Sequence, residues 1–581
     1  MSDVIVGIDL GTTNSEVAMV KDGQVTVIPI AAGGRILPSC VGLGDDGQLL
    51  VGEPAKNQYV LYPERTVRSV KRHMGSDERF VLGEQAYSPQ EISALILKRL
   101  KAIAEEHLQL AVTKAVITVP AYFSDAQRQA TREAGELAGL EVVRIINEPT
   151  AAALAYKADQ SQRKRVLVYD LGGGTFDVSV VAIEEDVVEV LASHGDNHLG
   201  GDDFDHLVVE HLVEHLQQTA GVDPTTSRRA MARIQRAAET AKIALSDQPF
   251  VLVEEEYLLE DEAGNPVNLS LEIQRDDYEA LIAPLIERTL EALHIALKGA
   301  HLALADVDEV LLVGGATRTP LIQTQLRDEL GLTVHAEIDP DLCVATGAAV
   351  QAAIYAGQPI ATVLVDVTPY TFGISALGER NGAWYPYVYV PLIHKNTSIP
   401  VAKGELFQTS HDDQVRVDIN VYQGEDPDAL NNIEIGKFTV ENLSAVPAGN
   451  PIVVNFALDL NGILQVTAIE KETGLQKSVT ITNAMGRVEG EAMASAKRRL
   501  AQLFPGEEKV ATDAGPRGDR ALRDRAHSRL ERAPALLDQV GGDDREDLIS
   551  AKEGLRDALE QDGDIGTAQG DLDDMLFYLE P

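Results

Sequence analysis

Two short turns rich in glycine and threonine carry the residues best suited to chemistry. GIDLGTTNS (7–15) and VYDLGGGTFD (168–177) each run from an apolar strand through Asp-Leu-Gly into a turn of small residues. Such a turn exposes several backbone N–H groups on one side, which makes a concave site for an anion. Glycine lets a phosphate come close, because it has no Cβ and tolerates positive φ. Thr12, Thr13 and Thr175 add hydroxyl donors.

The placement of the two turns indicates a pair. Asp9 and Asp170 hold the same position in the two copies, and roughly one domain length separates them. Two lobes built alike would place both turns around one cleft, where the aspartates could hold a hydrated Mg²⁺. Either turn alone is more readily an ordinary tight hairpin. The presence of both turns, with their aspartates at matching positions, favours a phosphate site.

A third glycine turn follows the strand pattern VDEVLLVGG (307–315) and precedes a helical pattern that begins near Pro320. This arrangement suits a contact with adenosine or a second phosphate at the start of a helix. The sequence contains no G-x-x-x-x-G-K-[ST], which excludes a P-loop enzyme. It also has no G-x-G-x-x-G that joins a strand pattern to a helical pattern, which counts against a dinucleotide-dependent dehydrogenase.

The elements that would position these turns change character along the chain. Residues 3 to about 357 alternate β-branched runs with helical patterns such as 89–108, which predicts a sheet covered by helices. A short apolar stretch, ATVLVD (361–366), follows. From 367 to about 483, strand-like runs broken by turn residues predict a compact all-β domain. Helical patterns return in the tail, interrupted by the polar stretch 505–519.

Composition sets the outer limits. A chain of 581 residues with 44% apolar residues predicts two to four domains with ample cores. The net charge of −41 repels nucleic acid and anionic lipid, although solubility or a salt-rich habitat also accounts for it. The N-terminus lacks the positive charge of a signal peptide, and no apolar run is long enough to span a membrane. Cys40 and Cys343 suggest neither a disulfide framework nor a metal site. We therefore expect a cytoplasmic protein without nucleic-acid or membrane partners.

Seven motifs resemble the DnaK-type, seventy-kilodalton heat-shock chaperones, in the same order and up to about residue 500. They are IDLGTTNS (8–15), ITVPAYFSDAQRQAT (117–131), INEPTAAALAY (146–156), DLGGGTFDVS (170–179), HLGGDDFD (198–205), LLVGGATRTP (311–320) and GAAVQAA (347–353). The segment 71–93, the TPYTFG start of the β domain and the brief C-terminal region are most similar to the HscC-type branch.

The resemblance implies a fold and a division into domains. The fold is an α/β actin-like two-lobed ATPase domain, followed by a β-sandwich peptide-binding domain and a short α-helical lid. The implied ranges are 1–357 for the ATPase, 358–366 for the interdomain linker, 367–485 for the β domain and 486–581 for the shortened lid and C-terminal region. The implied function is ATP-dependent chaperone activity, in which slow ATP hydrolysis controls binding and release of unfolded peptide.

The resemblance also implies catalytic roles. Lys71 should reach the γ-phosphate, where an ammonium can stabilise developing charge. Glu148 and Asp177 should orient the attacking water, and Thr175 should contact the γ-phosphate. Without the resemblance, Lys71 would be one more surface lysine and Glu148 an acidic residue at a helix start. The motifs contain no strong general base, so we expect slow hydrolysis by positioning and electrostatics.

The remaining residues of the implied ATPase site bind nucleotide or metal. The phosphate cradle is formed by Gly11, Thr12, Thr13, Asn14, Gly172, Gly173, Gly174, Gly200 and Gly201. The adenosine contacts are Glu239, Lys242, Ser246, Gly314, Gly315, Arg318 and Asp341. The spacing of 239, 242 and 246 places them on one helix face, which an ordinary amphipathic helix would also show. Asp9 and Asp170 would hold Mg²⁺, and the implied ligands are ATP or ADP with Mg²⁺, with K⁺ as a further candidate.

The β domain should hold unfolded or extended client peptides by backbone hydrogen bonds and one buried apolar side chain. The implied peptide contacts are Ile374, Leu377, Phe407, Ser410, Val417 and Ile419. Ile374 and Ile419 are as readily core residues, because half of any strand faces inward. Residues 379–393 carry Trp384 and three tyrosines, which predicts one face of a longer hairpin, with a client or partner surface as the alternative.

Coupling and partners follow from the same resemblance. Docking of the linker strand on the ATPase would report the nucleotide state to the β domain. The implied coupling residues are Pro120, Arg128, Arg132, Val363, Leu364, Val365 and Asp366. Of these, the resemblance marks Arg128, Arg132 and Asp366 as positions that also receive a J-domain co-chaperone. Binding of a standard nucleotide-exchange factor stays open, because the chain is shortened after Lys71.

Two other classes share the actin-like scaffold, since a fold alone does not fix function. A small-molecule kinase would need an acceptor pocket with a catalytic carboxylate and has no use for a linker and a β domain. A filament-forming protein would be obstructed by the appended domains. The sequence therefore favours the chaperone ATPase.

Overall fold

The computed structural model describes residues 4–21, 23–30, 34–156, 163–331, 334–335, 339–360, 362–481 and 491–503. The chain divides into two units between Ala496 and Lys497. All sheets and sites described below belong to the first unit.

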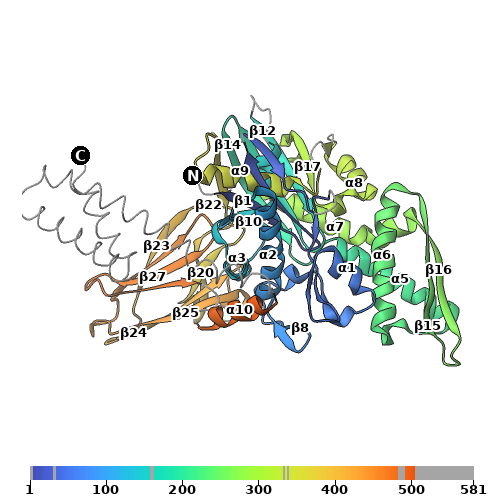
Figure 1. The fold of residues 1–581 in the computed structure, drawn as a ribbon. Coiled ribbons are helices and arrows are strands. Elements are labelled where there is room, and N and C mark those ends of the chain that lie inside the picture. The colour runs from blue at the N-terminus through green and yellow to red at the C-terminus, as the bar shows by residue number, and fades with distance from the viewer. Residues whose placement is uncertain are drawn as a thin grey trace, which may run out of the picture. The chain divides into compact units, whose positions relative to one another are not determined.

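The N-terminal sheet has the strand order β11-β10-β1-β2-β3, with β4 paired to β2. Figure 1 labels its strands β1 and β10. Its strands are β1 (Ile5–Leu10), β2 (Asn14–Lys21), β3 (Gln24–Val27), β4 (Leu37–Pro38), β10 (Lys114–Val119) and β11 (Glu141–Asn147). Helix α9 (Cys343–Tyr355) packs against β1, β2 and β10, and α3 (Asp125–Leu137) packs against β10 and β11. The first glycine turn joins β1 to β2, whose antiparallel register pairs Asp9 with Glu16.

Smaller elements lie between β4 and β10 in the chain. They are β5 (Val41–Leu43), β6 (Leu49–Val51), α1 (Glu53–Tyr59), β7 (Thr66–Val67), the 3-10 helix η3 (Val70–His73), β8 (Phe80–Leu82), β9 (Gln85–Tyr87) and α2 (Pro89–Leu108). Helix α2 has the predicted bounds because Ser88 caps its first turn in a capping box with Glu91. Lys71 lies in η3, the short 3-10 helix between β7 and β8.

The second sheet has the order β18-β17-β12-β13-β14-β19-β22. Its strands are β12 (Lys164–Leu171), β13 (Phe176–Glu184), β14 (Val187–Asp196), β17 (Glu309–Val313), β18 (Val334–His335), β19 (Val363–Val367) and β22 (Ser398–Ile399). The second glycine turn joins β12 to β13, and here the register pairs Asp170 with Asp177. Both predicted turns therefore connect antiparallel strands at matching points of two sheets, as the repeated sequence pattern predicts.

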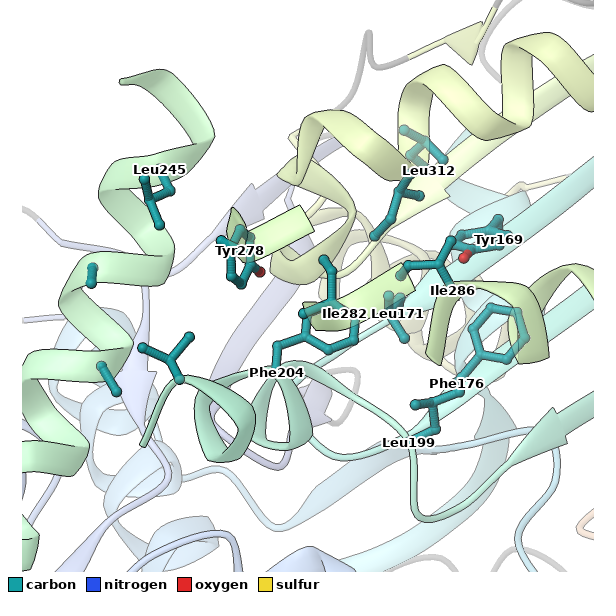
Figure 2. Close-up of a cluster of buried hydrophobic side chains, with 14 of the residues drawn as sticks. Tyr169, Leu171, Phe176, Leu199, Phe204, Leu245, Tyr278, Ile282, Ile286 and Leu312 are labelled. Atoms are coloured by element: carbon teal, nitrogen blue, oxygen red, sulfur yellow. The ribbon is translucent and has the colours of Figure 1, made fainter. Parts of the chain in front are cut away.

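Helices and one hairpin complete this lobe. They are α4 (Glu148–Tyr156), α5 (Gly201–Ala220), α6 (Arg228–Asp247), β15 (Phe250–Glu260), β16 (Pro266–Gln274), α7 (Arg275–Gly299), η6 (Gly315–Arg318) and α8 (Pro320–Leu330). Figure 2 shows the apolar cluster behind the second turn, where Tyr169 and Phe176 from its flanking strands meet Phe204 of α5 and Ile286 of α7. Burial of these large side chains fixes the direction in which the turn leaves the sheet.

The β-rich region contains two four-stranded antiparallel sheets, β21-β20-β24-β25 and β23-β26-β27-β28. Their strands are β20 (Phe372–Arg380), β21 (Ala383–Ile393), β23 (Val401–Gln408), β24 (Arg416–Gln423), β25 (Ile433–Glu441), β26 (Pro451–Leu458), β27 (Leu464–Glu470) and β28 (Gln476–Ile481). Side chains of both sheets share one buried cluster.

The predicted hairpin is confirmed as β20–β21; its greater length relative to other family members stays a prediction. Asn381 and Gly382 turn it, both with positive φ, which is the two-residue hairpin turn that suits an Asn-Gly pair. Its aromatic side chains differ in exposure: Trp384 is 77% exposed, whereas Tyr389 is buried.

The helical pattern after Gly490 forms α10 (Glu491–Gln502). The rest of the predicted lid lies outside the described residues. Within the described part of the chain, no helix has the length and apolarity needed to cross a membrane.

Candidate active site

The two glycine turns approach each other so closely that side chains would not fit between them. A Cβ on Gly173 would lie 1.9 Å from Oγ1 of Thr13, and one on Gly174 would lie 2.6 Å from Cγ2 of Thr12. The backbone of each turn therefore faces the opposite lobe directly. This is the arrangement that a phosphate chain clasped by main-chain N–H groups requires.

A pocket opens where the two turns meet the third. Of the residues predicted from the sequence, fourteen line it: Asp9, Gly11, Thr12, Thr13, Asn14, Lys71, Glu148, Asp170, Gly172, Gly173, Thr175, Gly314, Gly315 and Asp341. These positions span most of the ATPase region in sequence, yet they meet at the edges of both sheets. The site is therefore a product of the two-lobed fold and of no single segment.

Charge in this pocket is strongly unbalanced. Among the described residues that line it, Lys71 is the single cation, against the carboxyl groups of Asp9, Glu16, Glu148, Asp170 and Asp341. Lys71 is buried and forms an ion pair with Glu148. Burial is the main cause that raises the pKa values of Asp9, Glu148 and Asp170, with Lys71 opposing it in each case. So many buried acids beside amide-lined turns favour a ligand that brings both phosphate and a divalent cation.

The residues present fit a magnesium ion. Oδ2 of Asp170 is buried and has no hydrogen-bond partner, and Oδ1 of Asp9 accepts a hydrogen bond from Thr118 at 2.6 Å. No group of three or more acidic, histidine or cysteine side chains in the described residues is arranged to hold a metal by itself. Magnesium needs no such cage, because it binds through one or two carboxylates together with water and phosphate.

Asp177 lies one strand away from the pocket lining and is fully buried. Its two carboxylate oxygens accept hydrogen bonds from the backbone N–H groups of Ala121, at 3.1 Å, and Tyr122, at 3.0 Å. Burial raises the pKa of Asp177 to about 6, although these two amides lower it in part. Backbone amides of the 117–131 motif thus bind the carboxylate of Asp177, which belongs to the 170–179 motif.

The predicted adenosine contacts on α6 are engaged with other side chains. Glu239 forms ion pairs with Lys56 at 2.9 Å and Arg68 at 3.1 Å, which come from the opposite lobe. Lys242 forms an ion pair with Asp205 and donates to the carbonyl of Gly201. Ser246 is half-buried near the end of α6.

The third turn carries the remaining adenosine candidate. Arg318 bridges Asp339 and Asp341, at 2.8 Å to each. Gly200 and Gly201 lie against the second turn, where the Gly201 N–H donates to the Gly172 carbonyl at 2.9 Å. Asp341 and Gly172 line the pocket, whereas Arg318, Gly200 and Gly201 are not among its described lining residues.

The predicted linker strand docks on the second sheet. In β19, Val363, Leu364 and Val365 pair in parallel with β14, and Leu364 packs against the buried cluster beneath α4 and α9. The carboxylate of Asp366 accepts hydrogen bonds from Asn147 at 2.9 Å and Thr150 at 3.2 Å. The linker is therefore tied to the strand and helix that position Glu148.

The predicted coupling residues of the 117–131 motif lie after β10 and on α3, next to the N-terminal sheet. Arg128 is buried and donates to Oδ1 of Asn147 at 2.7 Å and to the Ala121 carbonyl at 2.9 Å. Arg132 donates to the Val142 carbonyl. Pro120 begins the loop whose amides hold Asp177, and its carbonyl accepts from Phe123 N–H. Asn147 thus connects Arg128 to Asp366.

With this geometry in hand, comparison with known proteins assigns the family. The profile of the family described as Hsp70 protein matches residues 5–81 and 77–574. The chain belongs to the Hsp70 family. It is 48% identical over 487 residues to the chaperone protein DnaK of Thermotoga petrophila, which covers 83% of this chain and 80% of that protein. The DnaK proteins of Thermotoga maritima and Thermotoga neapolitana match with the same identity and coverage.

Membership decides among the three classes considered from the sequence. An Hsp70 protein is an ATP-dependent chaperone and an ATPase, so the kinase and filament readings are set aside. The coarse prediction of a DnaK-type chaperone is confirmed.

The predicted peptide contacts of this Hsp70 chain are spread over different environments. Ile374 on β20 and Ile419 on β24 are buried in the shared core of the two sheets. Phe407 and Val417 pack against that core and are half-buried. Leu377 is 53% exposed, and Ser410 lies exposed in the loop after β23. Ile374 and Ile419 thus belong to the core, and Phe407 and Val417 adjoin it.

Three residues near the functional groups of this Hsp70 chain were not predicted. Glu16 lines the phosphate pocket, and burial raises its pKa well above the usual value. Asp125 is buried at the start of α3, and burial raises its pKa to about 8. Tyr370 contacts the loop that holds Asp177. For Glu16 a signal existed, because it directly follows the first glycine turn and precedes the apolar run VAMV, and acidic residues are seldom fully buried.

Proposed function

We propose that this Hsp70 chain uses ATP hydrolysis in the pocket between its two glycine turns to control capture and release of unfolded apolar segments by its β domain. The observation that carries the proposal is a buried pocket with one lysine among five carboxyl groups, tied through Asn147 to Asp366 of the linker. The proposed domains are those expected from the sequence: an ATPase at 1–357, a linker at 358–366, a β-sandwich at 367–485 and a lid at 486–581.

In the proposed reaction, water attacks the γ-phosphorus and the bond to the β-phosphate oxygen breaks, with no covalent enzyme intermediate. Lys71 stabilises charge on the transferring group, and Glu148 and Asp177 orient the water. The N–H groups and hydroxyls of the two turns hold the phosphates, and Thr175 contacts the γ-phosphate. Bound at Asp9 and Asp170, Mg²⁺ would supply charge neutralisation for the phosphates. Glu239, Lys242, Ser246 and Arg318 would hold adenosine, which requires some of their present ion pairs to open.

The β domain is the proposed client site. The exposed apolar side chain of Leu377 and the half-buried Phe407 and Val417 support this proposal, because they leave apolar surface outside the core. An extended segment would bind there by main-chain hydrogen bonds and one anchored apolar residue.

The proposed partners are unfolded clients and a J-domain co-chaperone, in the cytoplasm. The relatives named DnaK support both, and the features at 71–93 and TPYTFG keep the HscC-type branch as our proposal for the subgroup. Whether a standard exchange factor binds depends on the shortened segment after Lys71, and K⁺ is the further ion to be tested.

Coupling is tested by measuring ATP turnover with and without an apolar peptide in the wild type and in Leu364→Asp. We expect the peptide to change turnover in the wild type and not in the variant, because a carboxylate at Leu364 cannot pack on the apolar cluster beneath α4. Val363→Asp is the matched control: Val363 lies on the same strand but is 58% exposed, so coupling should survive. A wild type whose turnover ignores peptide would end the proposal.

The state of Asp177 gives a pH prediction. Its pKa is raised to about 6, and the ionised form is the one that can accept hydrogen bonds from water and the amides, so turnover should fall as pH falls through about 6. The check is the initial rate at saturating Mg·ATP between pH 5 and pH 8, with nucleotide affinity followed in parallel. Glu148, whose pKa burial raises to about 7, should cause a separate fall at higher pH. In Asp177→Asn, the residual turnover should lose the fall near pH 6 and keep the one due to Glu148. If turnover of Asp177→Asn still falls near pH 6, the fall belongs to another titrating group.

A further inference from the structure

Tyr370 joins the β-rich region to the loop that holds Asp177. It lies between β19 and β20, just after the docked linker strand. Its hydroxyl donates a hydrogen bond to the backbone carbonyl of Tyr122 at 2.5 Å. The two tyrosine rings also pack together, with centroids 4.7 Å apart and planes tilted by 43°. Tyr370 therefore contacts Tyr122 through both its polar and its apolar parts.

Tyr122 is bound on its other side by the candidate catalytic carboxylate. Its N–H donates to Asp177 at 3.0 Å, and its carbonyl, one peptide unit further on, accepts from Tyr370. The two peptide groups that flank Tyr122 thus face two different partners. Because they share the φ and ψ angles of this one residue, restraining the carbonyl also restrains the N–H that holds Asp177.

A second donor keeps the Tyr122 carbonyl satisfied within the ATPase. Asn197, which follows β14, donates its Nδ2–H to the same oxygen at 2.8 Å. The ring of Tyr122 also makes an edge contact with His194, at 5.1 Å between centroids. Loss of the Tyr370 hydroxyl would therefore leave the loop folded and its carbonyl paired, with one restraint fewer.

We propose that Tyr370 is a positioning residue that transmits docking of the β domain to Asp177 through the backbone of Tyr122. With the β domain docked, two donors fix the Tyr122 carbonyl; when the domain moves away, only Asn197 remains. The Ala121 and Tyr122 amides then hold Asp177 less tightly, and the water that Asp177 orients is placed differently. This inference rests on the proposed function, and it adds to it a route that bypasses Asp366.

Tyr370→Phe tests the route, since it removes the hydroxyl and keeps the ring contact. The quantity compared is the peptide effect, which is turnover with peptide divided by turnover without it. We expect this effect to be roughly three- to tenfold smaller in Tyr370→Phe than in the wild type, which is the size of one hydrogen bond. The KM for ATP and the peptide Kd should change less than about twofold. Tyr389→Phe is the matched control: its hydroxyl donates to the Thr371 carbonyl at 3.1 Å, within the β-rich region, so its loss should leave the ratio unchanged.

A double-mutant cycle separates positioning from general domain packing. In an Asp177→Asn background, single-turnover hydrolysis should lose its sensitivity to Tyr370→Phe, because the residue through which Tyr370 acts is already altered. An unchanged peptide ratio in Tyr370→Phe overturns the inference, and so does an equal effect of the substitution in both backgrounds. A wild type that shows no peptide effect defeats the proposed function itself, so the two failures are distinguishable.

Discussion

Replacing Lys71 with methionine is expected to lower the kcat for ATP hydrolysis by a factor of about 10² to 10³, the usual loss when one preorganised charge donor is removed. Lys71 is the single cation among the described residues of a pocket that carries five carboxyl groups. Methionine keeps the length of the side chain but leaves Glu148 without its partner beside Asp9 and Asp170. The negative charge that builds on the transferring phosphoryl group would then lack the one cationic side chain among the described lining residues.

The measurement is single-turnover hydrolysis at saturating Mg·ATP, with nucleotide affinity determined separately. Lys101→Met is the control, because Lys101 lies on α2 and donates only to the exposed carbonyl of Gly139. Its turnover should match the wild type. If Lys71→Met hydrolyses ATP within about threefold of the wild type, Lys71 has no role at the γ-phosphate, since even one ordinary hydrogen bond is worth that much.

Replacing Gly347 with alanine is expected to destabilise the ATPase lobes by about 3 kcal/mol, at the upper end for overpacking by one methyl group. The added Cβ would lie 1.7 Å from the carbonyl oxygen of Ala151, so helices α9 and α4 would have to move apart. The obstacle is backbone, which has no rotamer to yield. Because α4 begins at Glu148, its displacement should also lower turnover.

Chemical denaturation followed by the loss of helical signal measures the effect as a lower midpoint. Gly34→Ala is the matched control, because a Cβ at Gly34 meets no atom within 4 Å and its φ lies outside the left-handed region. Its midpoint should stay within the range typical of surface changes, about 0.5 kcal/mol. Equal midpoints for the two alanine variants would mean that the helices separate without cost, contrary to their packing.

Much of the local structure could be predicted because it depends on residues close in sequence. The two glycine turns and the strands before them follow from composition and alternation. Helix α2 begins at Pro89 because Ser88 and Glu91 form a capping box, and the β20–β21 hairpin turns at Asn381–Gly382 because that pair favours positive φ. Fourteen of the residues named from the turns and from the family resemblance line one pocket, and their roles in binding ATP stay predictions.

The sequence by itself determined which segments could cradle phosphate, because an amide-lined turn is a property of a few consecutive residues. Only the tertiary structure decided which side chains complete the site. The pairing of Lys71 with Glu148, the ion pairs of Glu239 with Lys56 and Arg68, and the line from Tyr370 through Tyr122 to Asp177 join residues far apart in the chain. Such contacts are set by how sheets and helices pack, and alternation along one strand says which face a residue takes but not what lies against that face.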